Sequence, residues 1–201
     1  MLLAQNITLT RSNRKIFEDI NISLASGKIV ILKGKNGSGK TSLLKTIVNI
    51  LQPTSGSIYW KGKPLYKTLY DFYDNITYIA DKTSSLRQLS TYENIRIWKN
   101  FFLSKVSYQQ IDNILEVLNL NKYTRAKVGN LSLGEIKKLE LVRLIIENKK
   151  IWILDEPLTN LDDESINVIE QTFVDHCSNG GSILFSSHQK PTIKLTEEIV
   201  L

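Results

Sequence analysis

The chain lacks the features that mark a secreted or membrane-spanning protein. Its 201 residues include one cysteine, Cys177, so an internal disulfide framework is excluded. No apolar run approaches the roughly 20 residues that span a bilayer. The start, residues 1–6, lacks the charged and then apolar pattern of an export signal. Without internal repeats or low-complexity segments, residues 1–201 are expected to form one domain with its own core, in the cytoplasm.

Positively charged residues are in modest excess over negatively charged ones. Lysine and arginine together number 26, aspartate and glutamate 20, which gives a net charge of +6. Such a balance permits contact with nucleic acid or anionic lipid. The lysines are nevertheless scattered along the chain, which is typical of a solvated surface, so we expect no direct nucleic-acid partner.

A glycine-rich segment with the sequence GKNGSGKTS follows the apolar run Ile29–Leu32 and precedes a segment with helical character, residues 40–51. Glycines let successive amide groups turn towards phosphate oxygens, and the following helix presents the positive end of its dipole. The segment therefore predicts a nucleoside triphosphate site, with a chance glycine-rich turn as the alternative. The residues expected to bind ATP are Gly34, Lys35, Asn36, Gly37, Ser38, Gly39, Lys40, Thr41 and Ser42.

Catalytic chemistry is indicated by this loop together with a second motif, Ile151–Glu156. Lys40 is expected to reach the outer phosphates, and Thr41 to offer its hydroxyl to Mg²⁺, which prefers hard oxygen ligands. Four apolar residues followed by two carboxylates predict a buried parallel strand that ends at the ligand crevice. Asp155 would hold Mg²⁺ through water, and Glu156 would accept a proton from the attacking water. A solvated acidic turn is the alternative for the second motif taken alone.

The periodicity of apolar residues divides the chain into a core and a helical insertion. Strands are predicted over residues 2–9, 20–24, 28–33, 57–60, 75–80, 151–154 and 182–187. Residues 84–147 show helical spacing, and a further helix is predicted over 162–177. Alternation of strand and helix predicts an α/β fold, with core residues 1–83 and 148–201 and a helical subdomain of 84–147. Ordinary core helices without a separate role are the alternative for that insertion.

The helical insertion contains the sequence LSLGE, residues 131–135, shortly before the acidic strand. As a local pattern it is a capping box, in which Ser132 and Glu135 each accept a hydrogen bond from the other's amide group. That explanation is structurally sufficient. The same place carries the LSGGQ signature of ATP-binding-cassette (ABC) proteins. With the two motifs above, the chain resembles an ABC transporter nucleotide-binding subunit over essentially its whole length.

This resemblance implies a P-loop NTPase fold, in which a RecA-like parallel sheet carries an N-terminal antiparallel β-subdomain and the inserted helical subdomain. It implies ATP and Mg²⁺ as cofactors, and a homodimer in which the signature residues Ser132, Gly134 and Glu135 complete the partner's ATP site. Asp162 lies in a segment, TNLD, that resembles the D-loop at the dimer interface. His188 resembles the switch histidine that contacts the γ-phosphate, although a lone histidine at a strand end is usually unremarkable.

Three positions depart from the family pattern. Leu133 and Glu135 stand where glycine and glutamine are usual, whereas Gly134 is retained. The glutamine that normally follows the 75–80 strand is missing, and Lys82 is the nearest match to this Q-loop position. Arg11 stands near the place of an aromatic residue that stacks on adenine, and its guanidinium group can stack on a base. These departures bear on turnover rate and adenine selectivity more than on the reaction class.

Three segments, residues 40–44, 55–65 and 152–157, closely resemble the ATP-binding subunits of haem exporters in bacterial cytochrome c maturation, the CcmA family. This resemblance implies haem export with a CcmB-like integral membrane permease, at the cytoplasmic face of the inner membrane. The alternatives are another ABC exporter with unrelated cargo, a soluble ABC protein, and a module that binds ATP without hydrolysing it. The two histidines, His176 and His188, lie outside any Cys-x-x-Cys-His motif, and no residue is an evident haem ligand.

Overall fold

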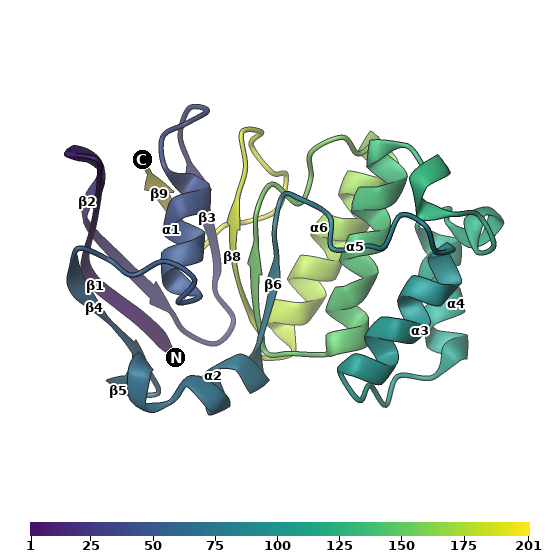
Figure 1. Cartoon of the computed structure of the whole chain (residues 1–201), viewed down its shortest axis with the longest axis horizontal. Helices are drawn as coiled ribbons and strands as arrows, with labels where there is room; N and C mark the ends of the chain where they lie inside the picture. Colours follow the sequence, from purple (N-terminus) through teal and green to yellow (C-terminus); the bar gives the residue numbers. More distant parts are fainter.

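The computed structural model describes residues 1–201 and builds them around two sheets (Figure 1). The antiparallel sheet has the order β2-β1-β4-β5, formed by β1 (Leu2–Arg11), β2 (Arg14–Leu24), β4 (Ser55–Trp60) and β5 (Lys63–Pro64). The parallel sheet has the order β6-β7-β8-β3-β9, formed by β3 (Ile29–Lys33), β6 (Ile76–Ile79), β7 (Ile151–Leu154), β8 (Ser182–Ser186) and β9 (Glu197–Val200). The expected α/β fold, with a parallel sheet and an antiparallel subsheet, is confirmed.

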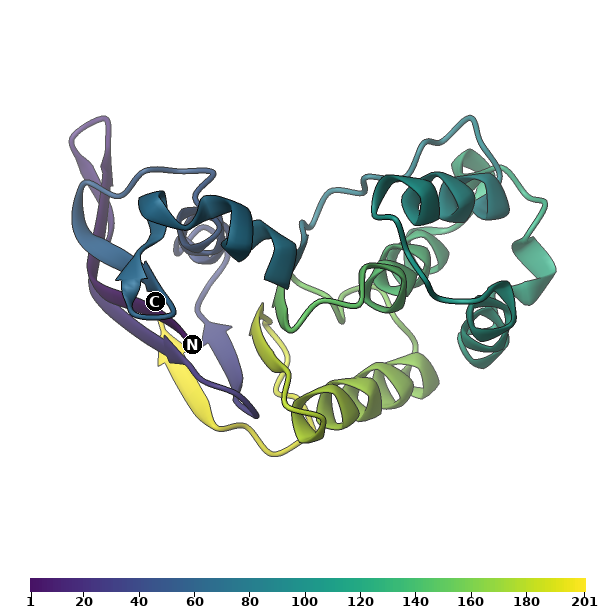
Figure 2. The same cartoon turned by 90° about the horizontal axis from the view of Figure 1, so that it is seen from below.

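Helices surround the parallel sheet and extend from one end of it. They are α1 (Lys40–Ile47), α2 (Leu69–Asn75), α3 (Thr91–Phe101), α4 (Tyr108–Val117), α5 (Leu133–Glu147) and α6 (Asp163–Ser178), with 3₁₀ turns η1 (Leu65–Lys67), η2 (Asn121–Tyr123) and η3 (Val128–Asn130). Helix α1 lies between the two sheets, whereas α3, α4 and α5 form a block at the opposite end from the antiparallel sheet (Figures 1 and 2). No helix is long and apolar enough to traverse a lipid bilayer.

The central parallel strands are apolar at successive positions because their two faces pack into different cores. Val30 and Leu32 of β3 belong to the core that includes α1 and the antiparallel sheet. Ile29 and Ile31 of the same strand belong to the core that includes α5 and α6. Strands β7 and β8 divide their residues in the same way. Full burial of each such side chain stabilises the fold by about 1.5–3 kcal/mol, which holds the strand ends, and therefore the loops after them, in fixed places.

Most predicted elements are present with shifted ends. The antiparallel strands β1, β2 and β4 are longer than predicted. The helix predicted over 40–51 is wrong at its end: α1 stops at Ile47, and the chain reverses through Asn49 in the left-handed conformation, φ 60°. The helix predicted over 162–177 begins one residue later, because Asp162 is its N-cap. The elements that were not predicted include the short helix α2, the two-residue strand β5 and the edge strand β9, which pairs with β3.

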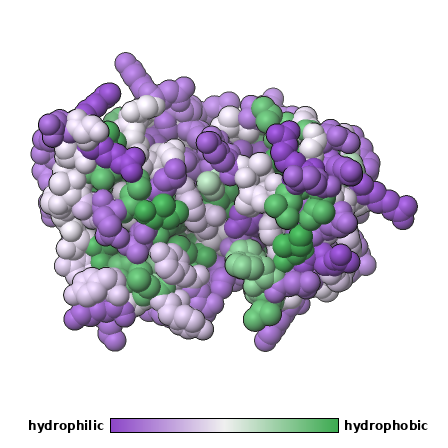
Figure 3. Space-filling view, in the orientation of Figure 1, coloured by the Kyte–Doolittle hydropathy of each residue, from purple (hydrophilic) through white to green (hydrophobic).

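The helical block is joined to the core by two chain segments. One runs from the end of β6 through residues 80–90 to α3, and the other, residues 148–150, continues from α5 into β7. Figure 2 shows the first segment crossing from the core to the block. The surface of the face in Figure 3 is mostly hydrophilic, with hydrophobic patches on both halves of the molecule. Two of the most exposed apolar side chains, Phe101 and Leu103, lie where α3 ends.

Candidate nucleotide site

The carboxyl ends of four parallel strands converge on one edge of the sheet. Strand β3 leads into the glycine-rich loop, β7 is followed by the two carboxylates, β8 by His188 and β6 by Asp81. Because β8 pairs with both β3 and β7, these segments are neighbours. A depression of about 310 Å³ lies at this edge, and its walls include Asn36, Gly37, Lys40, Thr41, Glu156 and His188. Ligands of open α/β sheets bind in such a crevice.

The loop of residues 34–39 is shaped to receive an anion. Helix α1 starts after Gly39 with no side-chain cap, so the amide groups of its first turn are available to a negative ligand at the positive end of the helix dipole. Gly39 has φ 107°, and a Cβ there would lie 2.8 Å from Cγ2 of Ile16, so a larger residue does not fit. The hydroxyl of Ser38 is buried without a hydrogen-bond partner, which a phosphate oxygen would supply.

Lys40 places a buried ammonium group at the floor of the depression. Its Nζ donates to the carbonyl oxygen of Gly34 at 2.9 Å and approaches that of Lys35 at 3.4 Å. The same Nζ lies 3.3 Å from Nε2 of His188 and 3.6 Å from Oε1 of Glu156. The side chain is only 7% exposed, so water screens its charge weakly and an incoming phosphate would experience most of it.

Glu156 is fixed in position but keeps one oxygen free. Its backbone nitrogen donates to Oγ of Ser186 at 2.9 Å, and Oγ1 of Thr159 donates to its Oε2 at 3.3 Å. Its Oε1 lies 3.0 Å from Nε2 of His188, yet neither this contact nor the one to Lys40 has hydrogen-bond geometry, so the buried Oε1 accepts no hydrogen bond. The residue has φ 48°, a left-handed conformation that costs roughly 1–2 kcal/mol outside glycine. A carboxylate whose backbone is fixed in this way and whose Oε1 accepts no hydrogen bond suits a proton acceptor.

Asp155 provides a second unoccupied oxygen. The residue is 1% exposed, and its Oδ1 accepts a hydrogen bond from Oγ of Ser186 at 2.7 Å. Its Oδ2 is buried and has no partner. An unpaired buried carboxylate oxygen is destabilising unless a cation or donor neutralises it. With the Thr41 hydroxyl on the wall of the same depression, the oxygen donors fit a hard divalent cation such as Mg²⁺.

Two residues expected near the nucleotide lie elsewhere. Lys82 lines a separate groove beside α5, and it is Asp81 that lines the nucleotide depression. Arg11 is exposed at the end of β1 and is not part of that wall, whereas Ile16 of β2 is. Stacking of Arg11 on a base and a Q-loop role of Lys82 therefore stay predictions. Asp81 follows the end of β6 after one residue, and this place could have been predicted to face the crevice, because the carboxyl ends of parallel strands do so.

The residues of the signature segment form a second surface. The predicted capping box at the start of α5 is confirmed, since Glu135 N donates to Ser132 Oγ at 3.3 Å and Ser132 N donates to Glu135 Oε2 at 2.7 Å. Gly134 touches the backbone of the TNLD segment: a Cβ there would lie 2.5 Å from the carbonyl oxygen of Asn160. None of these residues lines the chain's own nucleotide depression.

Asp162 fixes the TNLD segment between two helices. Its Oδ1 accepts from the backbone nitrogen of Ser165 at 2.8 Å and so caps α6, while its Oδ2 pairs with Nζ of Lys138 on α5 at 2.9 Å. Hydrogen bonds from Ser165 and Lys138 hold the pKa of Asp162 well below its usual range. The signature and TNLD segments therefore form one continuous surface.

The fold and this site define a nucleotide-binding domain of the P-loop class. A sequence model of the ABC transporter family matches residues 17–159, and the chain belongs to that family as an ATP-binding subunit, a type that pairs with permeases. It is 33% identical over 189 residues to the cytochrome c biogenesis ATP-binding export protein CcmA of Vibrio vulnificus, covering 94% of this chain and 92% of that one. It is 35% identical to the protein of the same name from Reclinomonas americana, covering 100% and 90%.

Solved structures agree on the fold. A putative ABC transporter ATP-binding protein from Pyrococcus furiosus superposes with a TM-score of 0.85 at 24% identity, covering 100% of this chain and 96% of the other. The ATP-binding subunit of another ABC transporter superposes with a TM-score of 0.82 at 23% identity, covering 94% and 79%. At these identities the likeness concerns the fold alone.

Proposed function

We propose that this ATP-binding subunit hydrolyses ATP to drive haem export for c-type cytochrome biogenesis. The main support for ATP hydrolysis is the buried Oε1 of Glu156, which accepts no hydrogen bond and lies beside His188 and Lys40. Support for haem as cargo comes from relatives named CcmA that align with nearly the whole chain.

In this proposal the residues of the depression divide the chemistry among themselves. Lys40 and the amide groups at the start of α1 bind and orient the phosphates. Glu156 accepts a proton at Oε1 from the attacking water, and His188, whose Nε2 lies 3.0 Å from that oxygen, contacts the terminal phosphate. Thr41 and Asp155 would hold Mg²⁺, which supplies neutralisation of phosphate charge when bound. Rigid placement of these groups is the main source of rate enhancement in such a site.

A second copy of the chain would complete each site. Ser132, Gly134 and Glu135 lie away from their own depression, on the surface shared with Asp162, so they are available to the nucleotide of a partner. A two-fold axis then makes both sites from the same parts. We propose that residues 84–147 act as the subdomain that carries this surface, and residues 1–83 and 148–201 as the core that holds nucleotide.

The remaining partner is an integral membrane permease of the CcmB type, which would hold the chain at the cytoplasmic face of the inner membrane. An exporter of unrelated cargo would have the same ATP chemistry, so the test must follow the cargo. In a strain that lacks the chain, haem-stained c-type cytochromes should disappear and return with the intact chain but not with Glu156→Gln. Normal c-type cytochromes in that strain would refute haem export and leave the ATPase assignment standing.

The permease partner can be tested separately by affinity purification of the intact chain from membranes. Co-purification of a polytopic subunit whose loss also abolishes c-type cytochromes is expected. A co-purified permease whose loss leaves those cytochromes unchanged would contradict the proposal.

A further inference from the structure

A buried carboxylate in the middle of α5 binds the segment that joins the core to the helical block. Glu140 is 3% exposed, and five hydrogen bonds reach it from residues 83–85. Its Oε1 accepts from the backbone nitrogens of Ser84 and Ser85 at 2.9 and 2.8 Å. It also accepts from the hydroxyls of Thr83 and Ser85 at 2.6 and 2.5 Å. Its Oε2 accepts from the Ser84 hydroxyl at 2.8 Å.

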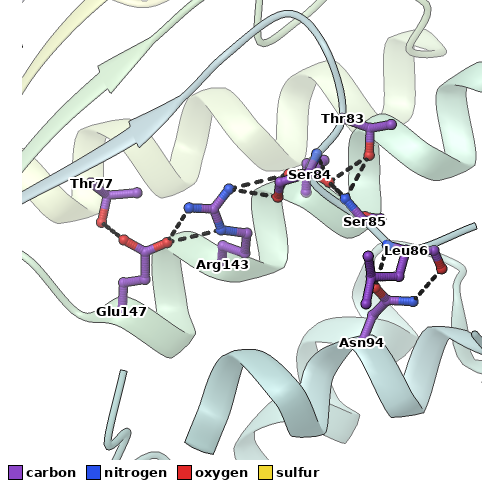
Figure 4. A network of polar contacts seen from close by, with 9 residues as sticks. Thr77, Thr83, Ser84, Ser85, Leu86, Asn94, Arg143 and Glu147 are labelled. Carbon is purple, nitrogen blue, oxygen red and sulfur yellow. Dashed lines mark hydrogen bonds and ion pairs between the residues drawn. The ribbon is translucent and has the colours of Figure 1, made fainter. Parts of the chain in front are cut away.

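The network continues along α5 to the parallel sheet (Figure 4). Arg143 NH1 lies 3.3 Å from Oε2 of Glu140 and donates to Oγ of Ser84 at 2.9 Å. Arg143 NH2 is 2.6 Å from Oε1 of Glu147, whose Oε2 accepts from Oγ1 of Thr77 in β6 at 2.9 Å. Strand β6, which precedes the crossing segment, and residues 83–85 within that segment are thus held against the same helix.

Glu140 is ionised in this network. Burial opposes its charge, but hydrogen bonds from Ser85, Thr83 and Ser84, with the positive charge of Arg143, outweigh burial and lower the pKa of Glu140 below its usual range. A buried charge with its donors gives little net stability compared with an apolar side chain, but it admits few geometries, because each donor must stay within hydrogen-bond distance. Such a group specifies the angle between two elements more than it stabilises their contact.

The angle between the crossing segment and α5 matters because of where these two elements lead. The crossing segment begins at the nucleotide depression, where Asp81 forms part of the wall and lies 3.6 Å from Nζ of Lys137, one helical turn before Glu140. Helix α5 is followed by the other connection to the core, and its first turn, after the N-cap Ser132, contains Gly134. The carboxylate therefore ties the first connection to the helix that leads into the second, at a point between the nucleotide depression and the signature surface.

We propose that Glu140 is a positioning residue: by clamping residues 83–85 to α5 it fixes the direction in which Ser132 and Gly134 are presented to the nucleotide of a second copy. This inference rests on the proposed ATP sandwich. The inference distinguishes nucleotide binding by one chain from closure of two chains around the nucleotide. Glu140 does not line the nucleotide depression, so it is expected to affect closure and not binding.

The test uses Glu140→Ala and Glu140→Gln, with Glu116→Gln as the control, because Glu116 is exposed on α4 in the same helical block. Each change is made in the intact chain and in a Glu156→Gln background that should retain ATP. Calorimetry measures nucleotide affinity, sedimentation measures ATP-dependent dimerisation, and steady-state assays give kcat at saturating ATP. Hydrogen exchange follows the amides of Ser84 and Ser85, which donate to Glu140.

For Glu140→Ala we expect a nucleotide affinity within about twofold of the parent. Amide hydrogen exchange should be faster at residues 83–85 and unchanged in β3. Dimerisation should weaken and kcat fall by about a hundredfold, the effect of displacing reacting groups by roughly 1 Å. Glu140→Gln should give an intermediate loss, since its amide oxygen can still accept from the crossing segment while its amide nitrogen opposes Arg143. Glu116→Gln should behave like the parent.

Two results would overturn the proposal. Normal kcat and dimerisation in Glu140→Ala, with faster exchange at residues 83–85, would show that the clamp does not set closure. Parallel loss of nucleotide affinity and of exchange protection in β3 would show that Glu140 supports the whole fold instead. If the proposed function itself is wrong, the result will differ: the Glu156→Gln parent will neither bind ATP nor dimerise.

Discussion

Gly134→Ala should separate the signature helix from the TNLD segment. The added Cβ would lie 2.5 Å from the carbonyl oxygen of Asn160, whereas real contacts of this kind are almost never below 3.0 Å, so the two backbones must part by at least about 0.5 Å. Overpacking against backbone costs about 1–3 kcal/mol of stability. Alanine recovers up to about 1 kcal/mol as the better helix former. The net expectation is a loss of about 1–2 kcal/mol of unfolding free energy.

The effect of Gly134→Ala on catalysis should exceed its effect on stability. If Gly134 completes the partner's ATP site as proposed, a shift approaching 1 Å there should lower kcat by about a hundredfold and leave the nucleotide affinity of the single chain nearly unchanged. Urea unfolding, calorimetry and steady-state ATPase assays measure the three quantities, with Glu116→Ala on the exposed face of α4 as the control. Unchanged kcat together with a crystal structure showing Asn160 undisplaced would refute this prediction, because the added methyl group would then fit without moving the TNLD segment.

Three further changes test separate parts of the site. Glu156→Gln should keep ATP binding, lower turnover by about 10²- to 10⁴-fold and trap a dimer; full activity would remove Glu156 from the mechanism. Lys40→Ala should weaken nucleotide binding itself, and a calorimetric titration with unchanged affinity would contradict its role. Asp162→Ala should lower the unfolding free energy by about 1 kcal/mol at neutral pH through loss of the α6 cap. Because folding lowers the pKa of Asp162, the ionised carboxylate stabilises the fold fully above pH 3.8, the ordinary pKa, and less as pH falls below that value. The unfolding free energies of Asp162→Ala and its parent should therefore converge in acid. A difference that stays constant down to pH 2 would show that the charge of Asp162 does not stabilise the fold.

Elements that carry their own signal could be predicted from sequence. The apolar run before the glycine-rich loop and the run before Asp155 are buried on both faces, so their composition alone marks them as central strands. The capping box of α5 is equally local, since all of its partners lie within three residues. The end of α1 was predicted wrongly because apolar residues continue past Ile47 into the turn, where Val48 and Leu51 pack against the core without helical conformation and Ile50 is exposed.

Contacts set by tertiary structure could not be found in this way. Strand β9 carries Glu197 and Glu198 at a sheet edge and exists through pairing with β3, 160 and more residues away. Ile16 enters the wall of the nucleotide depression because β2 passes the start of α1, a relation that no pattern in β2 encodes. The same limit applies to Glu140, which reads as an ordinary polar position on a helix and gains its partners about 55 residues earlier in the chain.

The departures of the signature segment from the family pattern fall where the structure has room for them. Glu135 still accepts the hydrogen bond from Ser132 N at 2.7 Å through a carboxylate oxygen, which is the part of the side chain that a glutamine shares. Leu133 is 70% exposed, so its side chain extends from the helix start without displacing a neighbour within the chain. At Gly134, by contrast, the carbonyl oxygen of Asn160 lies only 2.5 Å from the position that a Cβ would take. In the proposed ATP sandwich, closure of two chains depends on the backbone at this point, so we expect the retained glycine to matter more for turnover than the two altered side chains. Restoring glycine at 133 and glutamine at 135 should therefore change kcat less than Gly134→Ala does.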